Sequence, residues 1–421
     1  MRGQLGIGAM LVLAAGLVGC GGALVEPSQA GDGGGGPSGA ADADVPTPDA
    51  LDPVDAALAN DVGSPVAEDR APVSTDAGNP TADCNTPRVL LGNVPVFAAR
   101  MARLGDGLLV VWAAGSRTGI QAQRYDRQLR PQGFATQLGW LTGEQGVSVA
   151  MDVRDNRAVV AVQSRLYSVR YTPEGAPIVD PIVALGDGNA RAVRLMAQGT
   201  VQVVMDDGRF VFASEGRTSA NTPDRPLSAP FGSDVTVGFP ADGGGYSVYA
   251  PQPGVEPGRL TLRRFIFGHG AVLEVGGATA DGVDAAPVAL SGDTAYRLVQ
   301  TGGREVSLQM ETLTVDDLRP RARPRVMDNN AAWHRSSGAI AVDGASPLLV
   351  WSARAPSAGY NNLVRAQWPG LTETTTLYAA SSETTVQVWH ALAAEGAGWA
   401  LFAEMRGSSG VGVQARCVPV R

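Results

Sequence analysis

The sequence contains no lysine, and all 33 of its basic residues are arginine. Cysteine and histidine are scarce, with three of each in 421 residues. The absence of lysine excludes the phosphate-binding glycine loop of nucleotide-binding proteins, which requires that residue. Three cysteines with no CxxC pair exclude a disulfide-rich scaffold and a thiolate zinc site. The chain also lacks the GxSxG and HExxH motifs of serine hydrolases and zinc peptidases.

Long apolar runs and helical periodicity are missing as well. Only residues 5–18 form an extended apolar stretch, and these 14 residues are too few to span a bilayer comfortably. Elsewhere no window repeats its apolar residues with a period of 3.6, which excludes a helical solenoid. The sequence is instead rich in glycine, with 54 residues, and in short apolar runs between polar turns. These features predict an all-β protein.

A unit of turn, apolar strand, loop and alternating strand recurs along the chain. Its clearest copy is GDGLLVVW at 105–112, followed by GIQAQRYD at 119–126. The turns that begin the copies lie at 106–107, 155–156, 198–199, 242–243, 292–293, 343–344 and 395–396. Their spacing of about 43–52 residues is typical of propeller blades. We therefore expect a seven-bladed β-propeller over 84–421, with six or eight blades as the alternatives.

The seventh unit has three strands, and an extra apolar strand, RVLL at 88–91, precedes the first unit. We expect this strand to be the fourth of the last blade, since that leaves no long sheet edge unpaired. Cys84 precedes it, and Cys417 lies in the last strand of the chain. In an exported protein two such cysteines are expected to form a disulfide. Two free thiols are the alternative.

Residues 1–20 have the organisation of an export signal. Arg2 precedes the apolar core, which ends in LVGC at 17–20. This ending resembles the lipobox of bacterial lipoproteins, and the resemblance implies cleavage before Cys20 and lipidation of its sulfur. An ordinary secretory signal is the alternative. Gly21 lacks the negative charge that favours inner-membrane retention in Gram-negative lipoproteins, so we expect an outer-membrane anchor, with its face, periplasmic or surface, left open.

Residues 21–83 are predicted to be a disordered acidic tether. They contain no aromatic residue, 12 acidic residues and one arginine, and are dominated by Gly, Ala, Pro, Asp and Ser. Such a composition cannot bury enough apolar surface to offset the entropy of the chain. The net charge is −8 for the whole chain and −11 for the tether, and Arg2 adds +1, so 84–421 carries about +2. This small positive balance argues against nucleic acid as a partner.

Two tryptophan–histidine pairs are candidate ligand-binding residues. Trp333 and His334, and likewise Trp389 and His390, are predicted to precede the first strands of units six and seven. Neighbouring pairs near the central channel would form a stacking platform for a sugar or an aromatic group. The alternative is that they anchor loops at the mouth of the channel.

An arginine lies in or beside each connection between the second and third strands of a unit. Guanidinium groups match carboxylate and phosphate geometry, so a ring of them would favour an acidic polymer. Solvated residues at strand ends are the alternative. The seven residues are Arg117, Arg165, Arg209, Arg259, Arg304, Arg354 and Arg406.

The repeat pattern, the lipobox and the acidic tether together resemble secreted β-propeller lipoproteins of Gram-negative bacteria. The resemblance implies a fold and a location and transfers no catalytic residue. We expect a monomeric, non-enzymatic envelope protein without a cofactor or metal, whose propeller binds an acidic glycan or an envelope protein. The alternatives are a propeller enzyme acting on an acidic envelope polysaccharide and a structural envelope scaffold.

Overall fold

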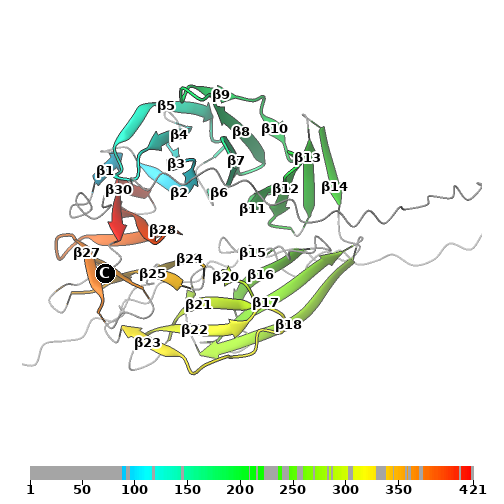
Figure 1. Cartoon of the computed structure of the whole chain (residues 1–421). Helices are drawn as coiled ribbons and strands as arrows, with labels where there is room; N and C mark the ends of the chain where they lie inside the picture. Colours follow the sequence, from blue (N-terminus) through cyan, green and yellow to red (C-terminus); the bar gives the residue numbers. More distant parts are fainter. Residues whose placement is uncertain are drawn as a thin grey trace, which may run out of the picture. The chain divides into compact units, whose positions relative to one another are not determined.

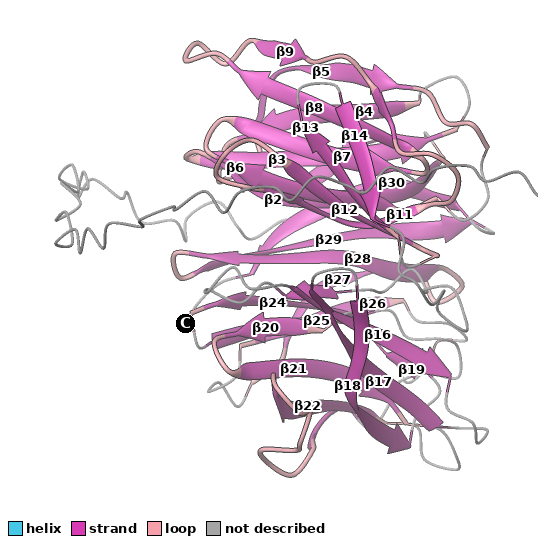
Figure 2. Cartoon of the chain, turned by 90° about the vertical axis from the view of Figure 1, so that its right-hand side faces the viewer, coloured by secondary structure: helices cyan, strands magenta, loops and turns pink. Residues whose placement is uncertain are grey.

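In the computed structural model, every described secondary-structure element is a β-strand (Figure 1). All the described strands belong to the unit Ser74–Arg421, and Figure 2 colours no described element as a helix. The predicted signal and tether lie outside the described residues. The structure describes residues 88–91, 95–115, 119–143, 147–207, 209–214, 217–221, 236–238, 246–253, 259–268, 271–281, 284–285, 288–301, 307–328, 338–344, 346–355, 358, 362–368, 373–406 and 409–418.

The first three sheets follow the predicted units in order, and the strands within each are antiparallel. The first sheet contains β2 (Val96–Leu104), β3 (Gly107–Ala114), β4 (Ile120–Tyr125) and β5 (Pro131–Gly139). The second contains β6 (Val149–Arg154), β7 (Arg157–Val162), β8 (Arg165–Tyr171) and two short strands that pair with β8, β9 (Pro177–Val179) and β10 (Val183–Ala184). The third contains β11 (Ala190–Leu195), β12 (Val201–Met205), β13 (Phe210–Ser214) and β14 (Arg217–Asn221).

The next three sheets repeat this order. The fourth contains β15 (Thr236–Gly238), β16 (Tyr246–Pro253), β17 (Arg259–Gly268) and β18 (Ala271–Asp281). In the fifth, two short strands, β19 (Asp284–Ala285) and β20 (Ala289–Ser291), pair with β21 (Thr294–Gln300), which is followed by β22 (Leu308–Thr314) and β23 (Arg325–Asp328). The sixth contains β24 (Gly338–Asp343), β25 (Ser346–Ala353), β26 (Leu363–Gln367) and β27 (Thr375–Ala379).

The seventh sheet contains β28 (Thr385–Ala394), β29 (Ala397–Arg406), β30 (Ser409–Val418) and β1 (Arg88–Leu91). β1 pairs antiparallel with β30, with Arg88 opposite Ala415, and this agrees with the place expected for residues 88–91. A single pairing, Val96 with Gly410, joins this sheet to the first. The fold is thus a seven-bladed β-propeller, as the repeats predicted (Figure 1).

The pattern of burial explains why these residues form such sheets. Every residue of β3 is buried, because the second strand of a blade is covered on both faces. In β4 buried and partly exposed residues largely alternate, as expected for a strand nearer the rim. The tight turn between β2 and β3 places Gly105 at a φ of 61°, where glycine adds no steric strain.

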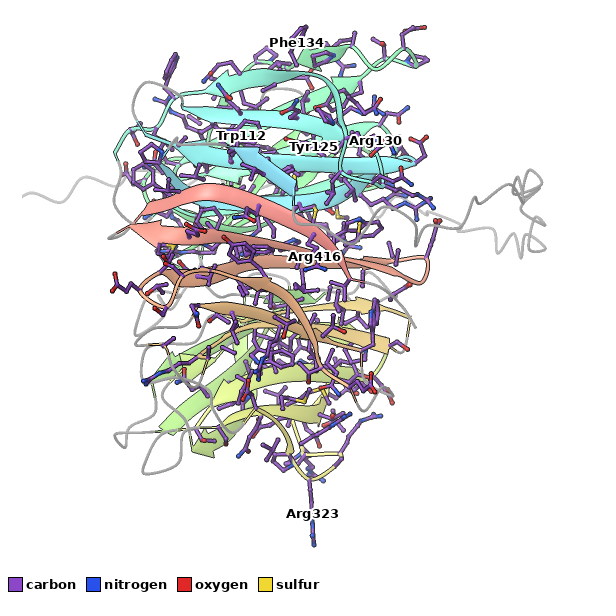
Figure 3. The ribbon with its side chains drawn as sticks, turned by 90° about the vertical axis from the view of Figure 1, so that its left-hand side faces the viewer. Trp112, Tyr125, Arg130, Phe134, Arg323 and Arg416 are labelled. Carbon is purple, nitrogen blue, oxygen red and sulfur yellow. The ribbon has the colours of Figure 1, made fainter. Side chains whose placement is uncertain are left out.

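The hydrophobic cores lie between neighbouring blades. Trp112 belongs to a buried cluster shared by the first and seventh sheets, and Trp351 to one shared by the fifth and sixth. Phe402 packs in a cluster shared by the sixth and seventh sheets. These aromatic residues near the ends of second strands therefore stabilise the stacking of blades. Figure 3 shows Trp112 and Tyr125 within the protein, while Phe134 projects from the rim with 97% exposure.

Polar contacts reinforce the junction between the seventh and first blades. The indole Nε1 of Trp399 donates a hydrogen bond to the carbonyl oxygen of Arg127 over 3.1 Å. In the turn between β28 and β29, the Glu395 carboxylate contacts Arg103 Nη1 at 2.6 Å and Arg127 Nη2 at 2.7 Å. The junction thus combines the single Val96–Gly410 pairing with the Trp399 hydrogen bond and the ion pairs of Glu395.

Candidate functional site

Residues on or directly beside the innermost strands of all seven blades line one cavity with a volume of about 300 Å³. The lining residues of β6 and β24 are the first three of each strand and those of β11 its second to fourth, while those of β2 and β28 lie near the middle of these longer strands. The cavity therefore lies toward the side on which the innermost strands begin, which we call the start face; the other side is the end face. Its described lining is Arg100, Met101, Val149, Ala150, Met151, Arg191, Ala192, Val193, Thr236, Val288, Gly338, Ala339, Ile340, Trp389 and His390.

Arg100 connects three neighbouring blades at the edge of the cavity. It lies on β2, and its Nε donates a hydrogen bond to the carbonyl oxygen of Val149 on β6 over 3.1 Å. Its Nη1 lies 3.5 Å from the carbonyl oxygen of Trp389 on β28. A guanidinium group has five donors, so Arg100 can hold both carbonyl groups at once and tie the three blades together beside the cavity.

His390 lies beside Arg100 on the inner strand of the seventh blade. Burial, reinforced by the positive charge of Arg100, lowers the pKa of His390 to about 3. The imidazole is therefore neutral at pH 7. Its Nδ1 is buried and has no hydrogen-bond partner among the described residues.

Arg191 brings a second guanidinium group to the cavity, from β11. Its Nη2 lies 3.6 Å from Asp206 Oδ2, and its side chain is only 13% exposed. Asp206 also accepts hydrogen bonds from the backbone and side-chain amides of Asn189, at 3.0 and 3.1 Å. The Nε of Arg191 is buried with no hydrogen-bond partner among the described residues. Because Asp206 is shared and its contact is long, the charge of Arg191 is only partly compensated.

The cavity is cationic on its polar side and apolar elsewhere. Arg100 and Arg191 are the charged residues in its described lining, and none of those lining residues is acidic. Thr236 contributes a hydroxyl group, which donates to the carbonyl oxygen of Val288 over 2.7 Å. Trp389 adds an aromatic ring, and aliphatic residues form most of the remaining wall. Such a lining suits a compact ligand that carries a negative charge.

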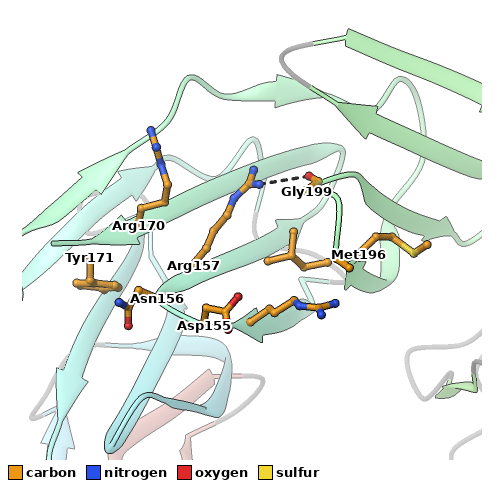
Figure 4. A pocket seen from close by; sticks show the side chains of 10 residues that line it. Asp155, Asn156, Arg157, Arg170, Tyr171, Met196 and Gly199 are labelled. Carbon is orange, nitrogen blue, oxygen red and sulfur yellow. Dashed lines mark hydrogen bonds between the residues drawn. The ribbon is translucent and has the colours of Figure 1, made fainter. Parts of the chain in front are cut away.

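A second pocket, of about 250 Å³, lies at the end face between the second and third blades (Figure 4). Arg157 projects into it, and its Nη1 donates a hydrogen bond to the carbonyl oxygen of Gly199 over 3.2 Å. The Nε of Arg157 donates to Ser168 Oγ over 2.9 Å, and Arg170 pairs with Asp180 at 2.7 Å. These guanidinium groups connect strands and blades, so we assign this pocket a structural role.

Tyr171 forms part of the wall of the same pocket. Burial raises the pKa of its hydroxyl group to about 12, against the opposing effect of Arg124. The Arg124 guanidinium lies 5.1 Å from the centre of the ring, in a cation–π contact. A hydroxyl group with so high a pKa remains protonated at physiological pH, which fits a packing role.

The sequence-predicted pair Trp389 and His390 lines the central cavity, but its position in the fold differs from the prediction. Both residues lie within β28, not before it. The pairing of β28 with β29 shifts register between Val388 and His390, which marks a β-bulge at Trp389. Two consecutive residues of β28 thus line the cavity, as three do on β6, whose pairing has no register shift. Trp333 and His334 lie outside the described residues.

Three of the seven arginines predicted to form a ring are described with their side chains, and none of the three lines the cavity. Arg165 begins β8. Arg209 donates a hydrogen bond to the carbonyl oxygen of Asp187 and pairs with Asp207. Arg354 donates one to the carbonyl oxygen of Ala358. For Arg209 and Arg354 these local bonds favour the structural alternative.

For the other four, the ring stays a prediction. Arg117 and Arg304 lie outside the described residues. Arg259 is the first residue of β17 and Arg406 the last of β29, so both sit at strand ends, and their side chains lie outside the described part.

Arg100 and Arg191 were not predicted from the sequence, although a signal for them exists. Each lies four residues before the last residue of its innermost strand, and so does His390. An alignment of the innermost strands on their final residues would therefore have grouped these three polar side chains.

Other predicted features have limited counterparts in the structure. Cys417 is buried on β30, whereas Cys84 lies outside the described residues, so their pairing stays a prediction. Within the described ranges, no cluster of three or more His, Cys, Asp or Glu side chains is arranged to hold a metal ion. The described segments also include no helix of the length and apolarity needed to cross a membrane.

No protein-family model and no curated protein matches the chain. Among solved structures, the chain is similar to YCF48 bound to a D1 peptide, with a TM-score of 0.46 and 8% sequence identity over 79% of this chain and 94% of that one. It is likewise similar to YCF48 from Cyanidioschyzon merolae, with a TM-score of 0.46 and 9% identity over 79% of this chain and 97% of that one.

Proposed function

We propose that this protein is a lipid-anchored recognition protein of the bacterial cell envelope that binds an acidic glycan at the start face of its propeller. The observation that carries the proposal is the central cavity. Seven blades contribute to it, and its described charged residues are Arg100 and Arg191. Guanidinium groups bind carboxylates through paired, charge-assisted hydrogen bonds, and tryptophan offers a surface on which sugar rings stack. A site with both is suited to acidic sugars.

The proposed anchor rests on the N-terminal sequence. LVGC at 17–20 matches a lipobox, and Gly21 favours sorting to the outer membrane of a Gram-negative cell. The 63 residues at 21–83 would span roughly 45 Å root-mean-square as a flexible coil. Their net charge of −11 would extend them further and keep them away from acidic polymers. The propeller would thus search for a ligand at some distance from the membrane.

Binding of immobilised acidic and neutral envelope glycans by the detergent-purified full chain tests the proposal. We expect retention of the acidic glycans only, and weaker retention as salt is raised, because exposed charge pairs are screened over about 8–10 Å at physiological ionic strength. Equal retention of neutral glycans, or no retention of either, would refute the glycan assignment. The anchor has its own test: Cys20→Ala should move the protein from the membrane fraction to the soluble fraction or leave it unprocessed.

A further inference from the structure

We infer that the central cavity is a binding site for one compact, carboxylate-bearing ring of the uronic acid type, held by Arg191 and Arg100 with its ring against Trp389. This inference deepens the proposed function by naming the chemical group that the start face recognises. The proposed contacts come from the cavity wall, to which each of the seven blades contributes at least one described residue, and not from the loop arginines.

The volume of the cavity limits the size of the ligand. About 300 Å³ is at the lower end of the range for small-molecule sites. One sugar ring fits such a space, whereas a polymer chain passing through it does not. The cavity would therefore hold a free acid or the terminal residue of a longer glycan.

The charges around the cavity favour a ligand with negative charge. Two guanidinium groups line it, and none of its described lining residues is acidic. The partner of Arg191, Asp206, lies at 3.6 Å and also accepts two hydrogen bonds from Asn189. A carboxylate in the cavity would therefore supply the close, charge-assisted partner that Arg191 lacks.

Trp389 gives the cavity a flat apolar surface. It lines the cavity next to His390 and also packs on the buried cluster between the first and seventh blades. An added Cβ at Gly410 on β30 would lie 2.4 Å from the indole, so this glycine leaves room for the ring, and a tryptophan fixed in this way can stack on the apolar face of a sugar.

Calorimetric titration of the full chain in neutral detergent with glucuronate and with glucose tests the inference. The two sugars are close in size and differ in the carboxylate, so the comparison isolates the charge. We expect saturable binding of glucuronate and at least about tenfold weaker binding of glucose. Equal affinities, or no heat from either sugar at millimolar concentration, would overturn the inference.

Three variants test whether the ligand binds in the cavity. Arg191→Gln should weaken the binding of glucuronate at least about tenfold, because it removes the charge-assisted hydrogen bonds. Ala192→Leu keeps both guanidinium groups and fills the cavity, so it should also abolish binding. Arg165→Gln, whose guanidinium does not line the cavity, is the matched control and should bind like the native protein. If Ala192→Leu and a folded Arg191→Gln both bind normally, the ligand is not in this cavity and the inference is wrong.

A third titration, with a short oligouronate, separates a free acid from a glycan end as the source of the carboxylate. Binding of glucuronate alone indicates a small-molecule site and counts against glycan recognition. If the protein retains acidic glycans but does not bind glucuronate, the proposed function stands and this inference is overturned.

Discussion

The indole Nε1 of Trp351 donates a hydrogen bond to Asp328 Oδ2 over 3.1 Å, across the boundary between the fifth and sixth blades. The same carboxylate oxygen lies 2.8 Å from Arg365 Nη1. Asp328 is 6% exposed, so one buried acid joins the outer strand of one blade to two strands of the next. This contact lies beside the buried cluster around Trp351, and its hydrogen bonds fix the relative orientation of groups that also pack through apolar contacts.

Asp328→Ala should lower the free energy of unfolding by about 2–4 kcal/mol, because it leaves the buried Trp351 indole and the partly buried Arg365 without this acceptor. Asp328→Asn keeps an acceptor for Trp351 and should cost less. Thermal and denaturant unfolding measure both effects. Asp316→Ala, at a side chain that is 89% exposed, is the control and should change little. A loss in Asp328→Ala no larger than in this control would contradict the role of the network.

The ion pairs of Glu395 predict an acid-sensitive junction between the last and first blades. Hydrogen bonding to Arg103 and the charges of Arg103 and Arg127 lower the pKa of Glu395 below its usual value. A carboxylate with a lowered folded-state pKa stabilises the fold above its unfolded-state pKa of about 4.3, and loses this contribution as the pH falls through the folded value.

Glu395→Gln should therefore lower the melting temperature slightly at pH 7, and the difference from the native protein should vanish in acid. The loss should stay below about 1 kcal/mol, because all three side chains are substantially exposed and screened by salt. Glu383→Gln, at an exposed turn before β28, is the matched control. A difference between native and Glu395→Gln that persists unchanged at pH 3 would exclude this linkage.

His390 predicts a second pH dependence, at higher pH. Its folded-state pKa of about 3 lies below the value of about 6.5 for an unfolded chain. Between these values the unfolded chain binds a proton and the folded protein does not, so stability falls as the pH drops below about 6.5. The slope contributed by one such group is at most about 1.4 kcal/mol per pH unit.

Replacement of His390 by Gln should flatten the stability profile between pH 6.5 and 4, measured by denaturant unfolding across that range. Arg100 and Arg191, the charged groups of the cavity lining, keep their charge throughout, so they add no titration of their own. Identical profiles for the native protein and His390→Gln would show that the imidazole takes up its proton in the folded state.

The repeat architecture was predictable because short, local sequence patterns specify the turns and strands of each blade. The run at 105–112 combines a turn with residues that are apolar on both faces, and it forms the turn and the fully buried β3. Residues 88–91 have no blade of their own in the sequence, and pairing with β30 is the arrangement that covers both edges. Strand order and blade number thus follow from period and from the avoidance of open edges.

The cavity was not predictable in the same way, because it depends on contacts between blades. Arg100 and Arg191 look like ordinary partly exposed positions of alternating strands, and only the circular arrangement brings them to one space. The bulge at Trp389 depends on the register of β28 against β29, which no local pattern specifies. The Trp–His pair was therefore recognised as a candidate but placed before the strand rather than within it.

The pairing of β1 with β30 makes the predicted disulfide between Cys84 and Cys417 testable. Arg88 lies opposite Ala415, and the two cysteines are four residues before the first and two residues after the second. Four residues of chain reach up to about 14 Å, so Cys84 is within reach of Cys417.

Peptide mapping under non-reducing conditions should yield one linked pair, and reduction should remove about 2–4 kcal/mol of stability because it releases a constraint on the unfolded chain. Cys84→Ser should match the reduced native protein, whereas Cys20→Ser should unfold like the oxidised one. Recovery of unlinked peptides containing 84 and 417 from the oxidised protein would rule the bond out, and the β1–β30 pairing would then close the ring without a covalent link.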